Sequence, residues 1–310
     1  MRGATALVFA TAMASAQTAP PPARQNFENV EVKVLPVQRN VYLLAAAGGN
    51  ITVQIGDDGI TVVDTAFGPL IPRILDQIRN LSKGHIRYII NTHVHGDHLG
   101  GNEALAKAIS TSNTEPLDII AHANVLNRLA ASRNLVNGEP IGFGLPIDEY
   151  DQSIKRLRYN GEAVVIYHEP KAHTDGDSIV LFRGSDVIST GDIFTPDSYP
   201  FIDIANGGSI RGEIAALNHL LELAVPGDHQ EGGTYLIPGH GRICDDADLV
   251  EYRDMVVIIT DRVQDAVKKG WSLNQVKAAK LTEDYDTQYG TQPGAGESFI
   301  ETVYKSLGGK

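Results

Sequence analysis

Residues 91–102 read N-T-H-V-H-G-D-H-L-G-G-N, and three histidines and one aspartate lie within six positions of this stretch. The stretch follows a mostly apolar run, residues 86–90, that predicts a buried strand. Imidazole and carboxylate groups at this density are the ligands that a transition metal prefers. The alternative is a polar loop whose histidines cluster by coincidence, but only ten of the 310 residues are histidine. The stretch therefore indicates a metal site.

The spacing within the stretch allows it to supply ligands to more than one metal ion. His93 and His95 are two residues apart, so both side chains can point the same way from a strand end or an extended loop. Asp97 and His98 come from the turn that follows. One short segment can thus present ligands to two neighbouring ions.

The same stretch resembles the H-x-H-x-D-H signature of the metallo-β-lactamase superfamily, whose members are mostly dinuclear metallohydrolases. Three later residues match the positions at which that family supplies its other ligands. They are His173 in P-K-A-H-T-D-G-D, Asp192 in S-T-G-D-I-F and His240 in I-P-G-H-G. Each adjoins an apolar run that predicts a strand, and strand ends at one sheet edge can converge on a single point. The resemblance covers roughly residues 30–261.

Carried over position by position, the resemblance implies three ligands for each ion, one bridging ligand and one outer carboxylate. The ligands of the first ion would be His93, His95 and His173. Those of the second ion would be Asp97, His98 and His240. Asp192 would bridge the two ions, and Asp64 would orient the ligand loop from outside. Five histidines and two carboxylates suit two zinc ions, with iron or manganese as alternatives.

The other residues with metal-binding or reactive side chains have no such context. Asp175 and Asp177, beside His173, could line a pocket or serve the turn between two strands. Cys244 is the only cysteine, so no disulfide can form within the chain, and a lone buried thiol is expected. The remaining histidines are interpreted as surface or packing residues: His85, His122, His168, His219 and His229.

Short β-branched runs split by turn signals predict strands, and amphipathic segments predict helices. The first four strands should form an antiparallel meander. Strands are expected at 30–34, 41–44, 51–53, 60–63, 86–91, 118–121, 153–159, 163–168, 178–182, 186–190 and 234–237. Helices are expected at 70–81, 103–109, 124–133, 209–223, 247–269, 273–281 and 298–307, with a capping box at Ser272 and Gln275.

Two strand-rich halves, each closed by helices, predict an α+β fold: a four-layer αββα sandwich of two mixed or antiparallel sheets with helices outside. The resemblance implies the same metallo-β-lactamase-type fold. We expect this domain at 29–261 and a helical C-terminal extension, packed on it, at 262–310. That extension could also form a homodimer interface, and the sequence does not decide the oligomeric state. Residues 134–152 form a long irregular segment that could wall or cover the site, or be an insertion without a role.

The N-terminus predicts export. Arg2, an apolar stretch over residues 4–14 and the A-x-A sequence at 14–16 indicate a secretory signal peptide (1–16) cleaved after Ala16. An alanine-rich frayed leader is the alternative. Residues 17–28, rich in proline and alanine at their start, should be a disordered lead-in. The mature enzyme is therefore expected in the periplasm or outside the cell, with no membrane span because no apolar run is long enough.

The charge of the chain limits its partners. A formal net charge of −12 argues against nucleic acid and anionic membranes, so a small-molecule substrate is expected. With Asp97 as the catalytic residue, a hydroxide held by two metals would attack the carbonyl of a carboxylic ester, thioester, lactone or lactam. Asp192 departs from the pattern of true β-lactamases, which the resemblance associates with cysteine or serine there, so an exported β-lactamase is the second hypothesis. A mononuclear iron persulfide dioxygenase is the third.

Overall fold

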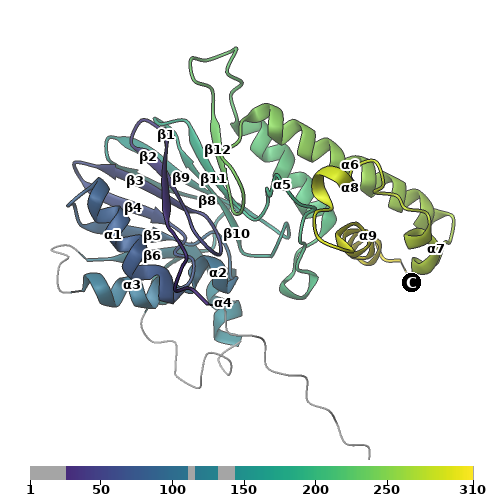
Figure 1. The fold of residues 1–310 in the computed structure, drawn as a ribbon, viewed down its shortest axis with the longest axis horizontal. Helices are drawn as coiled ribbons and strands as arrows, with labels where there is room; N and C mark the ends of the chain where they lie inside the picture. Colours follow the sequence, from purple (N-terminus) through teal and green to yellow (C-terminus); the bar gives the residue numbers. More distant parts are fainter. Residues whose placement is uncertain (1–25, 111–115, 132–143, 310) are drawn as a thin grey trace, which may run out of the picture.

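The computed structural model describes residues 26–110, 116–131 and 144–309, and in this part of the chain two sheets pack face to face (Figure 1). A seven-stranded sheet has the order β1-β2-β3-β4-β5-β6-β7, and a five-stranded sheet has the order β12-β11-β10-β9-β8. The strands of the first sheet are β1 (Lys33–Gln38), β2 (Val41–Ala45), β3 (Ile51–Gly56), β4 (Gly59–Val63), β5 (Ile86–Ile90), β6 (Asp118–His122) and β7 (Asp148–Tyr150). Those of the second are β8 (Ile154–Tyr159), β9 (Glu162–Glu169), β10 (Asp177–Phe182), β11 (Val187–Gly191) and β12 (Tyr235–Pro238).

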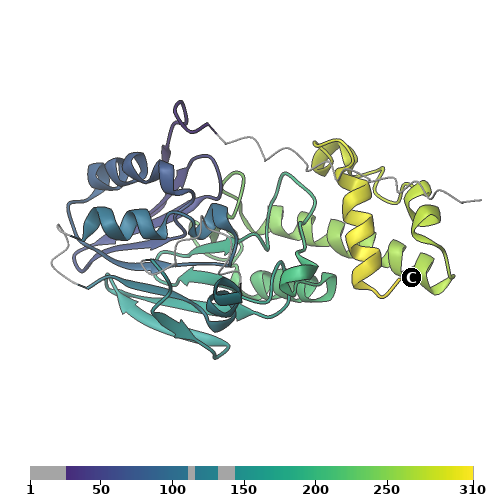
Figure 2. The same ribbon diagram turned by 90° about the horizontal axis from the view of Figure 1, so that it is seen from below.

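Helices cover both outer faces of the paired sheets (Figure 2). On the first sheet lie η1 (Gly68–Leu70), α1 (Ile71–Leu81) and α3 (Asn102–Ile109). On the second sheet lie α5 (Ile210–Leu223) and α6 (Asp246–Lys268). The shorter elements are α2 (Gly96–Leu99), α4 (Ala123–Ala131), η2 (Ile204–Asn206), α7 (Leu273–Ala278) and α8 (Asp286–Tyr289), and α9 (Ala295–Ser306) closes the described chain. The predicted four-layer αββα sandwich is confirmed.

Alternating side chains of the central strands explain the layering. In β10, Ile179 and Leu181 join the cluster beneath α5 and α6, whereas Val180 and Phe182 join the cluster between the sheets. In the first sheet, Ile89 faces α1 and α3, and Ile90 faces the second sheet. A strand that is covered on both faces needs an unbroken apolar run, because successive side chains point to opposite sides.

Strand direction determines where the metal-binding loops meet. Strands β1 to β4 are antiparallel, as expected from the meander, but β4, β5, β6 and β7 run parallel to one another. In the second sheet β11 and β12 are also parallel. Parallel neighbours end at the same edge of a sheet, so the loops after β4 and β5 lie together, as do those after β11 and β12.

The sequence missed five short elements: β7, α2, α8 and the 3₁₀ helices η1 and η2. Strand β7 lies inside the segment expected to be irregular, because its three residues carry no β-branched side chain. It pairs with β6, and the Tyr150 ring packs edge-on against His122 of that strand. Helices α2 and α8 are four residues each, too short for a helical period. Strand β1 (Lys33–Gln38) lies three to four residues later than the expected 30–34. The other described elements lie close to their expected positions, and the capping box of α7 is present.

Some expectations lie outside the described residues or stay predictions. The signal peptide, most of the lead-in and residues 134–143 of the irregular segment are not described. The domain division after residue 261 falls within α6 and stays a prediction. Among the described residues, no helix combines the length and apolar character that crossing a bilayer requires.

Candidate metal centre

The first sheet contributes four of the predicted ligands from one short segment. His93 and His95 lie in the loop that follows β5, and Asp97 and His98 lie on α2 directly after it. His93 and His98 are buried, with 1% and 0% of their surface exposed. A buried imidazole needs a partner for each ring nitrogen, so the partners of these rings decide what the segment can bind.

The second sheet contributes the other three ligands from three separate loops. His173 lies between β9 and β10, Asp192 follows β11 and His240 follows β12. The structure therefore brings all seven predicted ligands to one edge of the sandwich. They form two groups: His93, His95, His173 and Asp192 in one, and Asp97, His98 and His240 in the other, with the ligand atoms of each group within 4.8 Å of one another.

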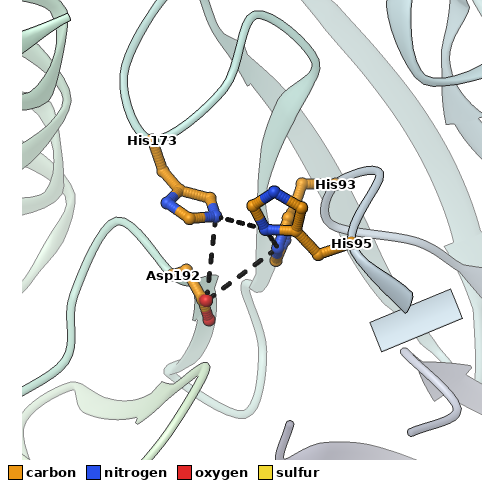
Figure 3. Close-up of side chains that lie close together, drawn as sticks. All are labelled: His93, His95, His173 and Asp192. Atoms are coloured by element: carbon orange, nitrogen blue, oxygen red, sulfur yellow. Dashed lines mark hydrogen bonds and ion pairs between the residues drawn. The ribbon is translucent and has the colours of Figure 1, made fainter. Parts of the chain in front are cut away.

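Figure 3 shows the first group, in which three imidazoles and the Asp192 carboxylate point toward a common centre. His95 Nδ1 lies 3.2 Å from His93 Nε2 and 2.9 Å from His173 Nε2. Asp192 Oδ2 lies 3.9 Å from His93 Nε2 and 3.7 Å from His173 Nε2. With Zn–N bonds of about 2.0–2.1 Å, tetrahedral ligand atoms are about 3.3 Å apart. The group has the size of a zinc site.

Hydrogen bonds at the outer ring nitrogens assign the tautomers of His93 and His173. The Thr92 hydroxyl donates to Asp64 at 2.7 Å, so its oxygen accepts from His93 Nδ1 at 2.9 Å. His173 Nδ1 donates to the carbonyl of Phe201. The inner Nε2 of each ring therefore carries a lone pair rather than a proton.

His95 completes this set of lone pairs. Its Nε2 donates to Asp203 Oδ2 at 2.9 Å, which leaves the inner Nδ1 unprotonated. With all three rings neutral, the lone pairs of His93 and His173 each face that of His95 at hydrogen-bond distance, with no proton between them. Lone pairs so arranged repel, and a cation at their centre would convert the repulsion into ligation. The residues present therefore fit a metal ion.

The second group is built around His98 and Asp192. His98 Nδ1 lies 2.7 Å from Asp64 Oδ2, so its Nε2 faces inward, 3.4 Å from His240 Nε2 and 3.1 Å from Asp192 Oδ1. Asp97 Oδ2 lies 3.3 Å from His240 Nε2 and 3.9 Å from His98 Nε2. Asp192 Oδ1 is buried and makes no hydrogen bond of good geometry. Asp192 Oδ2 lies 3.7 Å from His173 Nε2 of the first group and 3.5 Å from His240 Nε2 of the second, so the carboxylate stands between the groups and can bridge two ions.

Charge and burial act differently on the two groups. Burial lowers the pKa of His93 and His173, which favours the neutral ligand form. Burial opposes protonation of His98 too, but the Asp192 and Asp64 carboxylates raise its pKa well above the usual range. At His240 burial again acts to lower the pKa, but hydrogen bonds to Asp192 and Asp97 outweigh it and raise the pKa to about 9.

Asp64 supports both groups from behind. It is 2% exposed and follows β4 in a left-handed conformation, with φ of 62°. Its Oδ1 accepts the backbone N–H of Thr92 at 2.8 Å, and its Oδ2 accepts from Thr92 Oγ1 and His98 Nδ1. One carboxylate therefore orients a ring of each group. This is the position that the sequence predicted for an outer carboxylate.

Two outer contacts were not predicted. Asp203 holds His95, and the backbone carbonyl of Phe201 holds His173. Both come from the loop between β11 and α5, and no sequence signal distinguishes them, because Asp203 stands as a single carboxylate between Ile202 and Ile204, where it is the N-cap of η2. Asp203 also accepts the backbone N–H of Asn206, which caps that 3₁₀ turn.

Two glycines allow backbone segments to approach the ligands closely. A Cβ at Gly49, in the turn between β2 and β3, would lie 2.5 Å from Cε1 of His98. A Cβ at Gly239 would lie 2.0 Å from Asp192 Oδ1. The β2–β3 turn is tied to the loop after β12, because Asn50 donates its backbone N–H to the Gly239 carbonyl at 2.7 Å. The first sheet thus braces a ligand loop of the second.

The other candidate residues serve the fold. Asp177 accepts from the backbone N–H and the hydroxyl of Thr174, so it stabilises the turn that carries His173. Asp175 pairs with Arg128 at 2.7 Å. Cys244 is a buried free thiol, as expected. His122 and His168 stack with their ring centroids 3.4 Å apart, which agrees with a packing role.

A pocket of about 450 Å³ opens over the two groups. This volume lies in the range of small-molecule sites, about 300–1,000 Å³. Its lining comprises His95, Gly96, Asp97, Asp192, Thr195, Ser198, Tyr199, Phe201 and His240. Ligands of both groups therefore face the same solvent-accessible space.

Comparison with known proteins identifies the fold and the family. The model described as "Metallo-beta-lactamase superfamily" matches residues 36–240. A curated protein of Bacillus cereus, "Metallo-beta-lactamase type 2", is 20% identical over 200 residues, which cover 64% of this chain and 69% of the relative.

Solved structures share the fold at lower identity. The inverting sec-alkylsulfatase Pisa1 from Pseudomonas sp. superposes with a TM-score of 0.68 and 16% identity over 88% of this chain, which spans 50% of the sulfatase. A metallo-beta-lactamase from Pontibacter korlensis gives a TM-score of 0.58 and 14% identity over 73% of this chain and 99% of the other. The chain thus spans about half the length of the sulfatase and nearly all of the lactamase.

Asp203→Asn should weaken metal binding without unfolding the protein. Asparagine keeps an acceptor for the Asn206 N–H, but it lacks the negative charge of Asp203. That charge orients His95 and increases the basicity of its ring, so zinc affinity should fall about 10- to 100-fold in the variant. Competition with a chromophoric chelator measures this affinity. Asp228→Ala, which removes an exposed carboxylate outside both groups, is the matched control. Equal zinc affinity in Asp203→Asn and the wild type would contradict the assigned contact.

Chelator-treated protein should lose stability as the pH rises from about 6.5 to about 9. His98 and His240 have folded-state pKa values above their ordinary 6.5. Their contribution to the free energy of unfolding is therefore complete below pH 6.5 and disappears as the pH rises through the raised values. The pKa values of His93 and His173 are lowered, so these rings titrate below this window. Melting temperatures across the window test this. Zinc-loaded protein should show a flatter profile, because metal binds the neutral rings; equal slopes would contradict the prediction.

Proposed function

This chain belongs to the metallo-β-lactamase superfamily, and from that premise we propose that it is a dinuclear zinc hydrolase that cleaves a carboxylic ester, thioester, lactone or lactam. Members of the superfamily are hydrolases, so the protein is an enzyme of that class. The observation that carries the finer proposal is the geometry of Asp192. Its carboxylate lies between the two groups, with Oδ2 3.7 Å from His173 and 3.5 Å from His240 and with Oδ1 3.1 Å from His98. The lone pairs of His93 and His173 both point at that of His95.

The second group argues for two ions. A single iron, as in the persulfide dioxygenase hypothesis, would need only His93, His95, His173 and Asp192. Asp97, His98 and His240 nevertheless lie within ligand distance of one another, and the inward Nε2 of His98 has no partner other than ligands. A complete second group is better explained by a second ion than by a structural role. Imidazole-rich sites with carboxylates suit zinc, with iron or manganese as alternatives.

The chemistry follows from the donor set and the pocket. Two metal ions held by these residues would supply Lewis acidity, which would lower the pKa of water toward neutrality and polarise a substrate oxygen. Asp97 lines the pocket, and although burial acts to raise its pKa, the contacts with His240 and His98 outweigh burial and lower it. Its carboxylate is therefore ionised at neutral pH and can accept a hydrogen bond from the attacking water. Asp97 would orient that water toward the scissile carbonyl.

The choice between esters and lactams rests on the pocket and the relatives. The similarity to a metallo-beta-lactamase of Bacillus cereus keeps β-lactam hydrolysis as the second candidate. Among the described residues that line the pocket there is no lysine or arginine to receive the carboxylate of a β-lactam. Neutral esters, thioesters and lactones need no such partner, so we favour them. The net charge of −12 further supports a small-molecule substrate over nucleic acid.

Asp97→Ala should lower turnover about 10²- to 10⁴-fold while leaving the fold intact, because the attacking water loses its orienting carboxylate. Circular dichroism checks the fold, and metal analysis shows how much zinc the variant retains. The wild type should contain two zinc ions per chain and hydrolyse members of a panel of a chromogenic cephalosporin, an aryl ester, a thioester and a lactone, with chelator-sensitive rates.

The outcomes of that panel separate the hypotheses. Asp228→Ala is again the control and should retain wild-type rates. Near-normal turnover in Asp97→Ala would exclude the orienting role. One iron per chain would favour the dioxygenase hypothesis, and efficient turnover of the cephalosporin alone would identify a β-lactamase.

We also propose that the enzyme is exported, on the evidence of residues 1–16 alone. Expression of the full chain in an exporting bacterial host should yield a mature protein whose N-terminus, by mass spectrometry, is Gln17. Intact Met1 in the cytoplasmic fraction would reject the proposal.

A further inference from the structure

The metal pocket adjoins a second cavity that no predicted ligand touches. This cavity has a volume of about 140 Å³ and lies between residues 198–201 and the C-terminal helices. Residues 198–201, which we call the strap, line both cavities through Ser198, Tyr199 and Phe201. The two cavities therefore adjoin at the strap, so a ligand that extends from the metal pocket over these residues can reach the second cavity.

The strap is anchored at both of its sides. On the metal side, the Phe201 carbonyl accepts from His173, and the Phe201 ring lies 6.0 Å from His95 and 5.7 Å from His173. On the other side, the Tyr199 hydroxyl donates to Asp286 at 2.8 Å. A site built on anchored segments holds its ligand at a defined distance from the reacting centre.

Aromatic packing connects the strap to α9. The ring of Tyr199 stacks on Phe299, with centroids 5.3 Å apart and an interplanar angle of 11°. Phe201 is 64% exposed, although it is a large apolar side chain at the rim of both cavities. An exposed aromatic ring beside a catalytic pocket is a favourable surface for an apolar ligand.

The second cavity is lined by uncharged side chains. None of its described lining residues is charged, and aromatic and small polar side chains predominate. The lining consists of Ser198, Tyr199, Pro200, Phe201, Tyr289, Thr291, Gln292, Ala295, Ser298, Phe299 and Thr302. An anionic group would lose its hydration there without gaining a fixed cation, whereas an apolar chain would gain by leaving water.

We propose that this cavity is the subsite for an uncharged, apolar acyl chain, so that the preferred substrates are esters, thioesters or lactones with an extended acyl group. The inference rests on the proposed hydrolase function and deepens it. Part of the subsite comes from residues 289–302, outside the 36–240 range that the family model matches. The C-terminal helices would thus determine specificity in this chain.

A series of p-nitrophenyl esters from acetate to octanoate tests the proposal. In the wild type, kcat/KM should rise by up to about fourfold for each methylene until the cavity is filled. A terminal carboxylate on the chain should cancel the rise. Ser298→Trp fills the cavity from an exposed position on α9 and should abolish the rise while changing acetate turnover less than about twofold. Glu297→Trp, one residue along the same helix and also exposed, does not line the cavity and should behave as the wild type.

Binding to chelator-treated protein separates this inference from the hydrolase proposal. A neutral fluorescent probe, N-phenyl-1-naphthylamine, should bind the wild type and Glu297→Trp, be displaced by methyl octanoate, and bind Ser298→Trp at least about tenfold more weakly. If the probe behaves so but no ester is hydrolysed, the subsite stands and the hydrolase proposal fails. Ester turnover without chain-length preference, or unchanged probe binding in Ser298→Trp, would overturn the subsite.

Discussion

The convergence of imidazole lone pairs at one edge of the sandwich is the constraint on which the site depends. His93, His95 and His173 each donate their outer N–H to a partner and are left with an inner nitrogen, and His95 Nδ1 lies 2.9–3.2 Å from the inner nitrogens of the other two. Such an arrangement is unfavourable for the protein alone, because no proton separates the lone pairs. The surrounding structure keeps it, since each ring is held by an outer partner of its own. A cation between the rings would remove the repulsion between the inner nitrogens and leave the outer hydrogen bonds of the rings in place.

Residues of both sheets hold these rings in place. Parallel pairing places the ends of β4 and β5 together in one sheet and those of β11 and β12 together in the other. Asp64 at the end of β4 orients rings of both groups, and the β2–β3 turn touches His98 and is tied to the loop after β12. Each ligand group takes residues from both sheets, so a displacement of one sheet against the other would pull apart the ligands within each group. The apolar cluster between the sheets, which includes Ile90, Val180 and Phe182, prevents that displacement.

The strap relates the metal centre to the C-terminal helices. The Phe201 carbonyl accepts a hydrogen bond from the predicted metal ligand His173, and the Tyr199 ring packs on Phe299 of α9. One short segment thus orients a metal ligand and forms a wall of the proposed acyl subsite. The second cavity, on the far side of the strap, is lined by uncharged residues. The described residues that line the metal pocket include no lysine or arginine. Both observations favour neutral substrates. Superfamily membership alone does not distinguish an ester from a lactam or a sulfate ester. That distinction rests on the walls of the pocket.

The sequence by itself determined the elements whose signals are local. The dense motif at residues 91–102, the apolar runs of the central strands and the turn glycines predicted the layers, and the family resemblance added His173, Asp192, His240 and Asp64 to the candidate site. Only the tertiary structure decided the contacts of Asp203 and Phe201, the pairing of β7 and the approach of Gly49 to His98. These partners lie far apart in the sequence: Phe201 is 28 positions from His173, and Asp203 is 108 positions from His95. No residue type or period marks such contacts, because they exist only once the chain has folded, and the Asp203–His95 contact also requires the two sheets to pack together.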